Sequence, residues 1–220
     1  MDQRLSVALL LLGLTVLVDG QTVAAPFTGN ITRNGCGATK FCIETPTGCD
    51  PATSGNCLFA STAIDTTSAT GISFNLQGNS SGYIAAILTT AGNSTGDAFV
   101  CAQNAGDTLF YHTVYSSNGS SLIPNIFNNT VYNVTGSANN NIISCTFVAR
   151  NLTISNGKAT TLYNISLAVG DFTDGTLRAP DVRLQTQRKL VLSLYSASAP
   201  ALTAVDGMLI LVSGLIFGMY

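Results

Sequence analysis

Short hydrophobic segments recur along residues 57–194, and turn residues separate them. In several segments apolar and polar positions alternate, as in Ile72-Ser73-Phe74-Asn75-Leu76, which places the apolar side chains on one face of a strand. The separators, such as Gly78-Asn79-Ser80-Ser81-Gly82, are typical of turns, and no segment between residues 21 and 195 keeps a helical period. The pattern predicts an all-β fold, an antiparallel β-sandwich with one core, and strands at residues 57–64, 71–77, 82–90, 97–103, 108–115, 131–136, 142–149, 161–169 and 190–194.

The charge content excludes one class of partner. Of 220 residues only 9% are charged, with 9 Lys and Arg against 11 Asp and Glu, and the basic residues form no block. A nucleic-acid-binding surface needs such a block, so we expect no nucleic-acid partner. A surface with so few charges also needs another source of solubility.

Eight Asn-x-Ser/Thr sequons supply a candidate for that source. None has proline at its middle position, and glycans attached to them would make the surface polar. We expect most of the eight to be modified, with Asn151 and Asn164 the least secure because they lie in strand-like segments. The predicted glycosylation sites are Asn30, Asn79, Asn93, Asn118, Asn128, Asn133, Asn151 and Asn164.

The cysteines predict disulfides. Their even number suits three bridges in an oxidising compartment, but fifteen pairings are possible and the sequence does not choose among them. The cysteine-rich segment at residues 21–56 has little apolar pattern, so we expect its order to come from the disulfides. A zinc site is excluded because the chain has no Cys-x-x-Cys pair and one histidine. The six cysteines are Cys36, Cys42, Cys49, Cys57, Cys101 and Cys145.

Both ends of the chain have the character of targeting segments. Residues 1–20 contain an apolar run of about fourteen residues, which predicts a secretory signal peptide and is short for the alternative, a transmembrane helix. In residues 196–220, small residues precede a spacer and an apolar tail from residue 208, the order of a glycosylphosphatidylinositol (GPI) signal. We expect a lipid anchor in the outer leaflet, attached at Ser196 or else at Ser198. The alternatives are a membrane span through the tail and release by cleavage. Residues 57–195 would then form the sandwich.

A series of short motifs follows in order through the domain: Gly35-Cys36-Gly37 with Lys40 and Cys42, Pro46 and Cys49, Cys57-Leu58-Phe59, Phe74-x-Leu76-x-Gly78, Gly82-Tyr83-Ile84-Ala85, Gly96-Asp97-x-Phe99-Val100-Cys101, and Leu167-Ala168-Val169-Gly170 with Leu177-Arg178. This order and the cysteine spacing resemble the DOMON domain carried by ferric-chelate reductase and its relatives. The resemblance implies an antiparallel β-sandwich that binds haem b or sugars, or that serves as an extracellular interaction module.

The haem ligands that the resemblance implies are missing. The haem-binding members hold iron between a methionine, which would lie just before Gly96-Asp97, and a histidine near residues 177–180. The chain has neither there, its methionines are Met1, Met208 and Met219, and its one histidine is His112. We therefore expect no cofactor, with a haem b held by His112 alone as the alternative. The ordinary interpretation of His112 is a polar residue on the outward face of a strand.

No catalytic set can be assembled from the sequence. There is no Gly-x-Ser-x-Gly elbow, and the available carboxylates, Asp97, Asp107, Asp171 and Asp174, follow turn glycines or lie in a turn. A calcium site at Asp171 and Asp174 is a further option, since both side chains could offer oxygen ligands. We expect no enzyme activity.

The function expected from these patterns is that of a non-catalytic, GPI-anchored extracellular glycoprotein that binds a protein or a carbohydrate. Strand aromatics could form a stacking platform, with Tyr111 and Tyr115 on the exposed face. One alternative is a haem-binding redox domain, and another is a structural coat protein shielded by glycans. The candidate aromatics are Tyr83, Phe110, Tyr111, Tyr115, Tyr132 and Tyr163.

Overall fold

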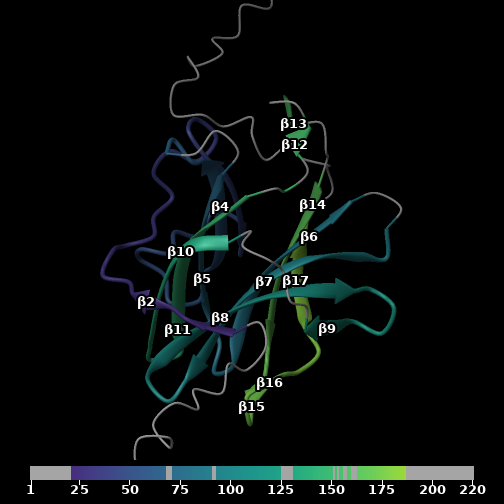
Figure 1. Cartoon of the computed structure of the whole chain (residues 1–220). Helices are drawn as coiled ribbons and strands as arrows, with labels where there is room; N and C mark the ends of the chain where they lie inside the picture. The colour runs from purple at the N-terminus through teal and green to yellow at the C-terminus, as the bar shows by residue number, and fades with distance from the viewer. Residues whose placement is uncertain are drawn as a thin grey trace, which may run out of the picture.

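The structure of the protein is a computed structural model. It describes residues 21–67, 71–90, 93–124, 131–150, 152, 154–155, 158–159 and 163–186. Within these ranges the chain forms strands and turns and no helix, and two sheets pack face to face around a shared core (Figure 1). The predictions of an all-β fold and of a β-sandwich are confirmed.

The larger sheet has seven strands, and all of its pairings are antiparallel. Their order is β1-β8-β7-β6-β14-β17, and β9 also pairs with β8. The strands are β1 (Gln21–Val23), β6 (Tyr83–Thr90), β7 (Thr95–Asn104), β8 (Asp107–Ser116), β9 (Ser121–Pro124), β14 (Tyr163–Gly170) and β17 (Asp181–Gln185).

The smaller sheet has six strands in the order β2-β10-β11-β5-β4-β3. It is mixed, because β2 pairs with β10 in parallel while the other pairings are antiparallel. Its strands are β2 (Ala25–Pro26), β3 (Phe41–Thr45), β4 (Leu58–Ile64), β5 (Ile72–Asn79), β10 (Val131–Asn139) and β11 (Ile142–Ala149). Two short hairpins stand outside both sheets: β12 (Ile154–Ser155) with β13 (Lys158–Ala159), and β15 (Phe172–Thr173) with β16 (Thr176–Leu177).

The first described residues connect the two sheets at one edge. β1 pairs with β8 of the larger sheet, and two residues later β2 pairs with β10 of the smaller one. Between them, the Ala24 amide donates to the Thr108 carbonyl oxygen at 2.9 Å. Residues 21–26 therefore form a strap that crosses from one layer to the other.

Eight of the predicted strand segments correspond to strands, with ends that differ by up to three residues, and the ninth, residues 190–194, lies outside the described residues. The structure adds strands that the pattern did not predict: β1, β2, β3, β9, β17 and the two short hairpins. These strands are short or lie at sheet edges, and β17 is exposed at four of its five positions. Few positions in these strands are fully buried, so the strands show little alternation of apolar and polar residues.

The inner faces of the two sheets enclose the main core. Phe147 of β11 lies at its centre, with its ring centroid 4.9 Å from that of Phe74, 5.0 Å from Phe99 and 4.9 Å from Phe110. All four rings are buried, and they come from both sheets. The aromatic cluster thus joins the two layers.

The outer face of the larger sheet is apolar as well. Tyr83, Ala85 and Ile87 of β6 form a second buried cluster, and Phe172 and Leu177 of the β15–β16 hairpin pack against it. The segment 83–88 is apolar at every position, so β6 is buried on both sides. Burial of such a strand follows from its continuous run rather than from alternation.

Tyr111, which was predicted to belong to an exposed stacking platform, is not exposed on this face. Its side chain is buried, its ring lies 5.9 Å from the ring of Phe172, and its hydroxyl donates to the Gln21 Oε1. Tyr115 is partly buried against the same cluster. The expectation that Tyr111 is exposed is wrong because the β15–β16 hairpin packs on this face of the sheet.

The six cysteines form three disulfides, as predicted, and the structure settles their pairing as Cys36–Cys42, Cys49–Cys57 and Cys101–Cys145. The first two close short loops within the cysteine-rich segment and its border. The third is buried and joins β7 to β11, one strand from each sheet.

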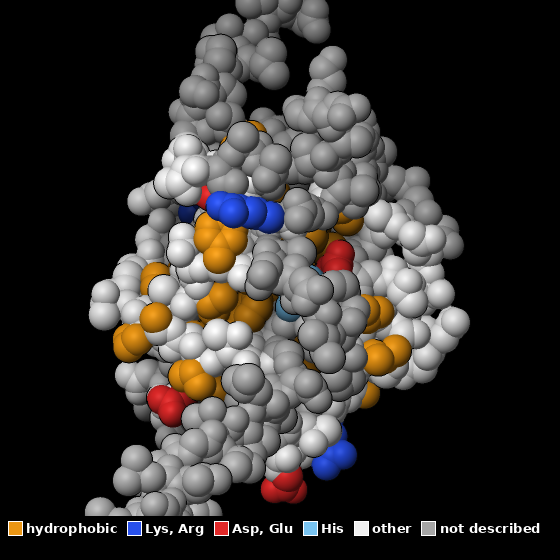
Figure 2. All heavy atoms as spheres, in the orientation of Figure 1, with side chains coloured by type: hydrophobic (Ala, Val, Ile, Leu, Met, Phe, Trp, Pro, Cys, Tyr) orange, Lys and Arg blue, Asp and Glu red, His pale blue; other side chains and the backbone are white. Residues whose placement is uncertain are grey.

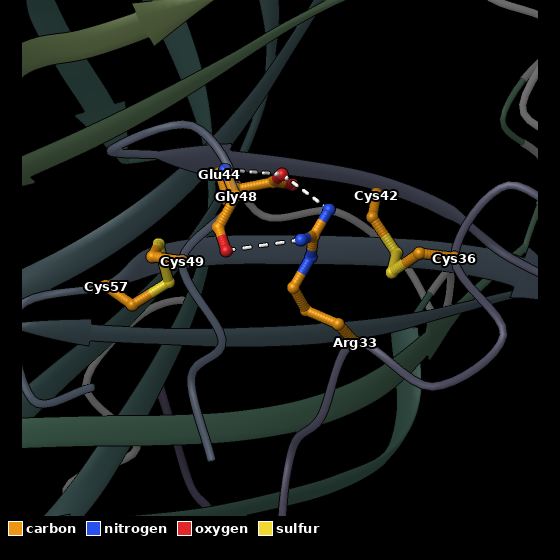
Figure 3. A network of polar contacts seen from close by, with 7 residues as sticks. All are labelled: Arg33, Cys36, Cys42, Glu44, Gly48, Cys49 and Cys57. Carbon is orange, nitrogen blue, oxygen red and sulfur yellow. Dashed lines mark hydrogen bonds and ion pairs between the residues drawn. A yellow bond between two sulfur atoms is a disulfide. The ribbon is translucent and has the colours of Figure 1, made fainter. Parts of the chain in front are cut away.

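The cysteine-rich segment is ordered by more than its disulfides (Figure 3). Its strand β3 pairs with β4, and Arg33 lies between the two local bridges. The Arg33 guanidinium pairs with the Glu44 carboxylate at 2.9 Å and donates to the Gly48 carbonyl oxygen at 3.2 Å. The expectation that disulfides alone order this segment is therefore incomplete: a strand pairing and an arginine clamp contribute too.

Candidate functional site

A pocket of about 240 Å³ lies at the end of the sandwich where β6 passes to β7. Its lining combines hydroxyl, amide and carboxylate side chains with an aromatic ring and aliphatic groups. We name it the Asp97 pocket, and it is lined by Leu88, Thr90, Asn93, Thr95, Gly96, Asp97, Val114 and Tyr163.

Asp97 belongs to β7 and faces the interior of the sandwich. In β7 it shares one face with Phe99 and Cys101, both of which belong to the main core. Its side chain is 34% exposed, so the carboxylate lies at the border between the core and the pocket. The alternative that Asp97 serves only as a turn residue after Gly96 is wrong, because both residues lie within β7.

His112 is the partner of Asp97, and the sequence-based interpretation of it as outward facing is wrong. In β8 it lies directly opposite Phe99, and the two rings stack with centroids 4.7 Å apart. Its Nε2 is 3.3 Å from the Asp97 Oδ1, and its side chain is only 10% exposed. His112 therefore stacks on the buried Phe99 ring and pairs with the Asp97 carboxylate from behind the pocket wall. It is not among the described residues that line the pocket.

A glycine lets the pocket form beside β6. Gly96 pairs with Thr89 across the β6–β7 ladder, and a Cβ at residue 96 would collide with the carbonyl oxygen of Leu88. The two backbones approach closely here because residue 96 has no side chain. Gly96 therefore keeps Asp97 and Thr95 next to the end of β6.

Asn93 lines the pocket, and its neighbour Ser94 connects the β6–β7 turn to the β8–β9 turn. The Asn93 Nδ2 donates to the Thr90 Oγ1 at 2.6 Å, and both side chains line the pocket. The Ser94 carbonyl oxygen accepts hydrogen bonds from the amide and the hydroxyl of Ser117, at 2.7 and 3.0 Å. The β6–β7 and β8–β9 turns are thus tied together at this end.

The other carboxylates considered in the sequence do not join this site. Asp107 begins β8 in an exposed turn, and Asp174 lies in the turn between β15 and β16 with a φ of 52°. Asp171 precedes β15, where its carbonyl oxygen accepts a hydrogen bond from the Arg178 amide. Within the described ranges no three His, Cys, Asp or Glu residues gather as metal ligands, so the structure gives the calcium option no support.

Most of the aromatic candidates are core residues. Tyr83, Phe110, Tyr111 and Tyr163 are buried, while Tyr115 and Tyr132 are partly buried. The Tyr83 hydroxyl donates to the Arg178 carbonyl oxygen at 2.8 Å, and burial, followed by the charge of Asp171, raises its pKa. Tyr163 alone of this set reaches the Asp97 pocket, so no extended stacking platform is formed by the described aromatics.

The donor set does not fit a haem with two axial ligands. The chain has one histidine, and its Nε2 faces the Asp97 carboxylate. The resemblance placed the methionine just before Gly96, where residues 91–95 are Ala, Gly, Asn, Ser and Thr. No described side chain supplies the second ligand that haem iron takes in Met/His or bis-His coordination.

The sequons that the structure describes lie mostly at the surface. Asn30, Asn79, Asn93 and Asn118 are exposed, and so is Asn133, which sits with a φ of 54° in the bulge of β10. Asn164 is partly buried in β14, between β6 and β17, whereas Asn128 and Asn151 lie outside the described residues. Glycosylation of these sites stays a prediction. Its motive, a surface of few charges, is visible in Figure 2, where the charged side chains on the face shown are few and scattered.

A half-buried polar cluster outside the pocket contains a carboxyl group, that of Asp65, whose pKa is lowered. The Tyr132 hydroxyl donates to the Asp65 Oδ2 at 2.7 Å, and the Arg150 guanidinium lies 4.0 Å from the centroid of the Tyr132 ring. The hydrogen bond from Tyr132 is the largest cause that lowers the pKa of Asp65, with Thr67 and Arg150 adding to it and burial opposing it.

We expect Tyr132→Phe to destabilise the fold by less than about 1 kcal/mol at pH 7, because solvent still reaches this half-buried pair. A carboxylate with a lowered pKa in the folded state stabilises it above the pKa of the unfolded chain, and this contribution is lost as the pH falls through the folded pKa. Urea denaturation should therefore show the difference from wild type at pH 7 and little of it under strongly acidic conditions. In the Asp65→Asn background the substitution should cost less; equal losses at both pH values would contradict the assignment.

Three comparisons relate the chain to known proteins. No family model matches it. A protein of Danio rerio named "Putative ferric-chelate reductase 1" is 26% identical over 196 residues, which cover 84% of this chain and 33% of that protein. The chain thus spans about a third of the length of this relative. The cytochrome domain of Myriococcum thermophilum cellobiose dehydrogenase aligns with a TM-score of 0.39 and 14% identity, over 67% of this chain and 76% of that one.

The described part of the chain contains no helix that is long and apolar enough to cross a bilayer. The predicted signal peptide at residues 1–20 and the predicted lipid-attachment segment at residues 196–220 lie outside the described residues.

Proposed function

We propose that this chain, a DOMON-like β-sandwich related in sequence to a ferric-chelate reductase, is a non-catalytic extracellular module that binds a carbohydrate in the Asp97 pocket. The observation that carries the proposal is the chemistry of that pocket. Thr90 and Thr95 offer hydroxyls, Asp97 offers a carboxylate, and Tyr163 offers part of an aromatic ring. Sugars present many hydroxyls and apolar ring faces, which such side chains bind by hydrogen bonds and by stacking.

The same pocket supports a binding role over a catalytic one. Glycoside hydrolysis ordinarily uses two carboxyl groups, one on each side of the scissile bond. Asp97 is the only carboxylate among the described residues that line the pocket. His112 is held by stacking on Phe99 and by its contact with Asp97, so its role is to position the carboxylate rather than to touch a ligand.

The side chains available to bind iron also favour a function without haem. A redox module related to ferric-chelate reductase would need an iron site, and the donor set around His112 offers one imidazole in contact with a carboxylate. For that reason the electron-transfer alternative ranks second. A purely structural coat protein ranks third, because it gives the polar pocket no role.

Three features support a place outside the cell and a lipid tether. Three disulfides are typical of proteins that fold in an oxidising compartment. Eight sequons accompany a surface of few charges. The small residues at Ser196-Ala197-Ser198 precede a spacer and an apolar segment, in the order of a GPI-attachment signal. We propose Ser196 as the attachment site.

The test uses the full chain expressed at a cell surface. Phosphatidylinositol-specific phospholipase C should release the protein into the medium, and the released protein should show no Soret band, with or without added haem. Calorimetric titration with a panel of neutral monosaccharides and N-acetylated hexosamines then measures binding. Because Asn93 is itself a sequon, the titration is run on both the wild-type protein and the Asn93→Gln variant.

Asp97→Asn should weaken binding of any sugar that binds, because the neutral amide is a poorer acceptor than the carboxylate. Asp174→Asn is the matched control, since Asp174 is exposed in a distant turn, and it should leave binding unchanged. If no sugar of the panel binds to either form, the carbohydrate proposal fails. A Soret band would restore the haem-binding alternative, and failure of the lipase to release the protein would overturn the lipid tether.

A further inference from the structure

We propose that an N-linked glycan on Asn93 occupies the Asp97 pocket and controls access to it. The inference deepens the proposed function, since it concerns regulation of the same site. It predicts that the chain exists in two forms, one with the pocket covered by its own sugar and one with the pocket open. It is carried by the position of a single atom, the Nδ2 of Asn93.

The Nδ2 atom is the point of attachment, and it belongs to a residue that lines the pocket. It donates to the Thr90 Oγ1 at 2.6 Å, and Thr90 is itself a lining residue. Asn93 is exposed, so a glycosyl group has room to join at this atom. The first sugar would therefore begin beside the pocket wall, and not out in solvent.

The modification uses a reagent of the secretory pathway, a lipid-linked oligosaccharide pyrophosphate. The bond between the anomeric carbon and the pyrophosphate oxygen breaks, and a bond from that carbon to Nδ2 forms. Nδ2 loses one proton to solvent and keeps the other, and the lipid pyrophosphate leaves. The remaining N–H can still donate to Thr90, so modification does not require that this contact be lost.

The chemistry of the pocket fits the first sugar of such a chain. Thr95 and Asp97, which line the pocket on the strand that follows the turn, offer hydrogen-bond partners to its hydroxyls. A tethered group has a high effective concentration at a site next to its tether, so even weak contacts keep it there. A free ligand of the same chemistry must then compete with the attached sugar.

The neighbouring turn supplies a matched comparison. Asn118 is also an exposed sequon, and Ser117 beside it bonds to the Ser94 carbonyl oxygen. The two sequons thus lie on turns that are tied together, but the Asn118 side chain is not among those that line the pocket. A glycan at Asn118 should extend near the pocket without filling it.

The experiment measures coverage of the pocket without any added ligand. Full-chain protein released from cells is treated with a water-soluble carbodiimide and an amine, and peptide mass spectrometry follows labelling of the Asp97 carboxylate, which is 34% exposed. The same spectra report whether Asn93 carries a glycan. Asp174, in an exposed turn, is the internal reference.

We expect wild-type protein glycosylated at Asn93 to label at Asp97 several-fold more slowly than Asn93→Gln protein. Thr95→Ala removes the same sequon while keeping Asn93; because it also shortens a side chain of the pocket wall, it should label at least as fast as Asn93→Gln. Asn118→Gln should label as slowly as wild type, and Asp174 should label equally in all four proteins. Sugar binding, where it occurs, should be stronger in Asn93→Gln than in wild type.

Two outcomes overturn the inference: an unmodified Asn93 in the wild-type protein, or equal labelling of Asp97 in glycosylated wild type and Asn93→Gln. Failure of the proposed function looks different. In that case Asn93→Gln exposes Asp97 to the carbodiimide, as expected, but no sugar of the panel binds to the opened pocket.

Discussion

Replacing Cys101 and Cys145 together with alanine lowers the free energy of unfolding by about 4 kcal/mol, the expected entropy of a bridge that closes a loop of this length. The two cysteines are 44 residues apart in sequence, and they connect β7 of one sheet to β11 of the other. Both are completely buried. Without the bridge the unfolded chain regains the freedom of the whole loop, whereas the native layers keep only their side-chain packing. Chemical denaturation of the oxidised protein and the double variant measures the difference.

The matched control is the Cys36→Ala/Cys42→Ala variant. Its bridge spans a sequence separation of 6, for which the same entropy argument gives about 2.2 kcal/mol. This bridge also lies at the edge of the smaller sheet, where Arg33 and the β3–β4 pairing hold the same segment. Equal losses in the two variants would contradict the view that the inter-sheet bridge constrains the fold most.

The second large effect is expected at the centre of the core, where Phe147→Ala should cost about 3 to 5 kcal/mol. The ring is 1% exposed and contacts the rings of Phe74, Phe99 and Phe110, so its removal leaves a cavity bordered by both sheets. Because these neighbours are themselves held by strand pairing, they cannot collapse into the space. Denaturant titration should show a lower midpoint with an unchanged slope.

Phe172→Ala provides the comparison. Phe172 packs on the outer face of the larger sheet from a two-residue strand and is partly exposed. We expect its substitution to cost less than half as much as Phe147→Ala. If the two variants were equally unstable, the outer cluster would contribute as much to the free energy of unfolding as the core between the sheets. The view that one core dominates the stability would then be wrong.

The sequence was sufficient to predict the central strands. Residues 142–149 form β11 with the predicted limits, and the alternation in residues 72–76 corresponds to a strand with alternating burial. These strands lie between other strands of their sheet. One face of each packs on the core, so apolar residues must alternate with polar ones along the strand. The strap at residues 21–26 and the edge strand β17 were missed because their stability comes from pairing, which no local pattern records.

His112 shows why the site could not be predicted fully. The segment Leu109-Phe110-Tyr111-His112-Thr113-Val114 carries apolar side chains in both phases, so alternation does not tell which face is inner. In a half-buried strand a polar residue ordinarily faces solvent, so His112 was predicted to face outward. In the structure it faces inward, because Phe99 and Asp97 of the neighbouring strand offer it a stacking surface and a charge. Those partners depend on the register of β7 against β8.

The rim of the pocket was visible in the sequence only as a sequon. Asn93, Thr95 and Asp97 are close in sequence, but Val114 and Tyr163 reach the same pocket from β8 and β14. The pairing of Cys101 with Cys145 posed the same difficulty, since it joins strands of different sheets. Long-range juxtapositions of this kind are set by the topology.

The strap at residues 21–26 has a consequence for the order in which the protein is assembled during synthesis. A ribosome delivers these residues before any other described part of the chain, yet their pairing partners are β8 and β10, which emerge some 90 to 110 positions later. The earliest residues must therefore wait, unpaired, until most of the sandwich has left the ribosome. Contacts this distant in sequence form slowly. We expect closure of the strap to be among the last events in the maturation of the chain, after the bridges Cys36–Cys42 and Cys49–Cys57 have had time to form locally.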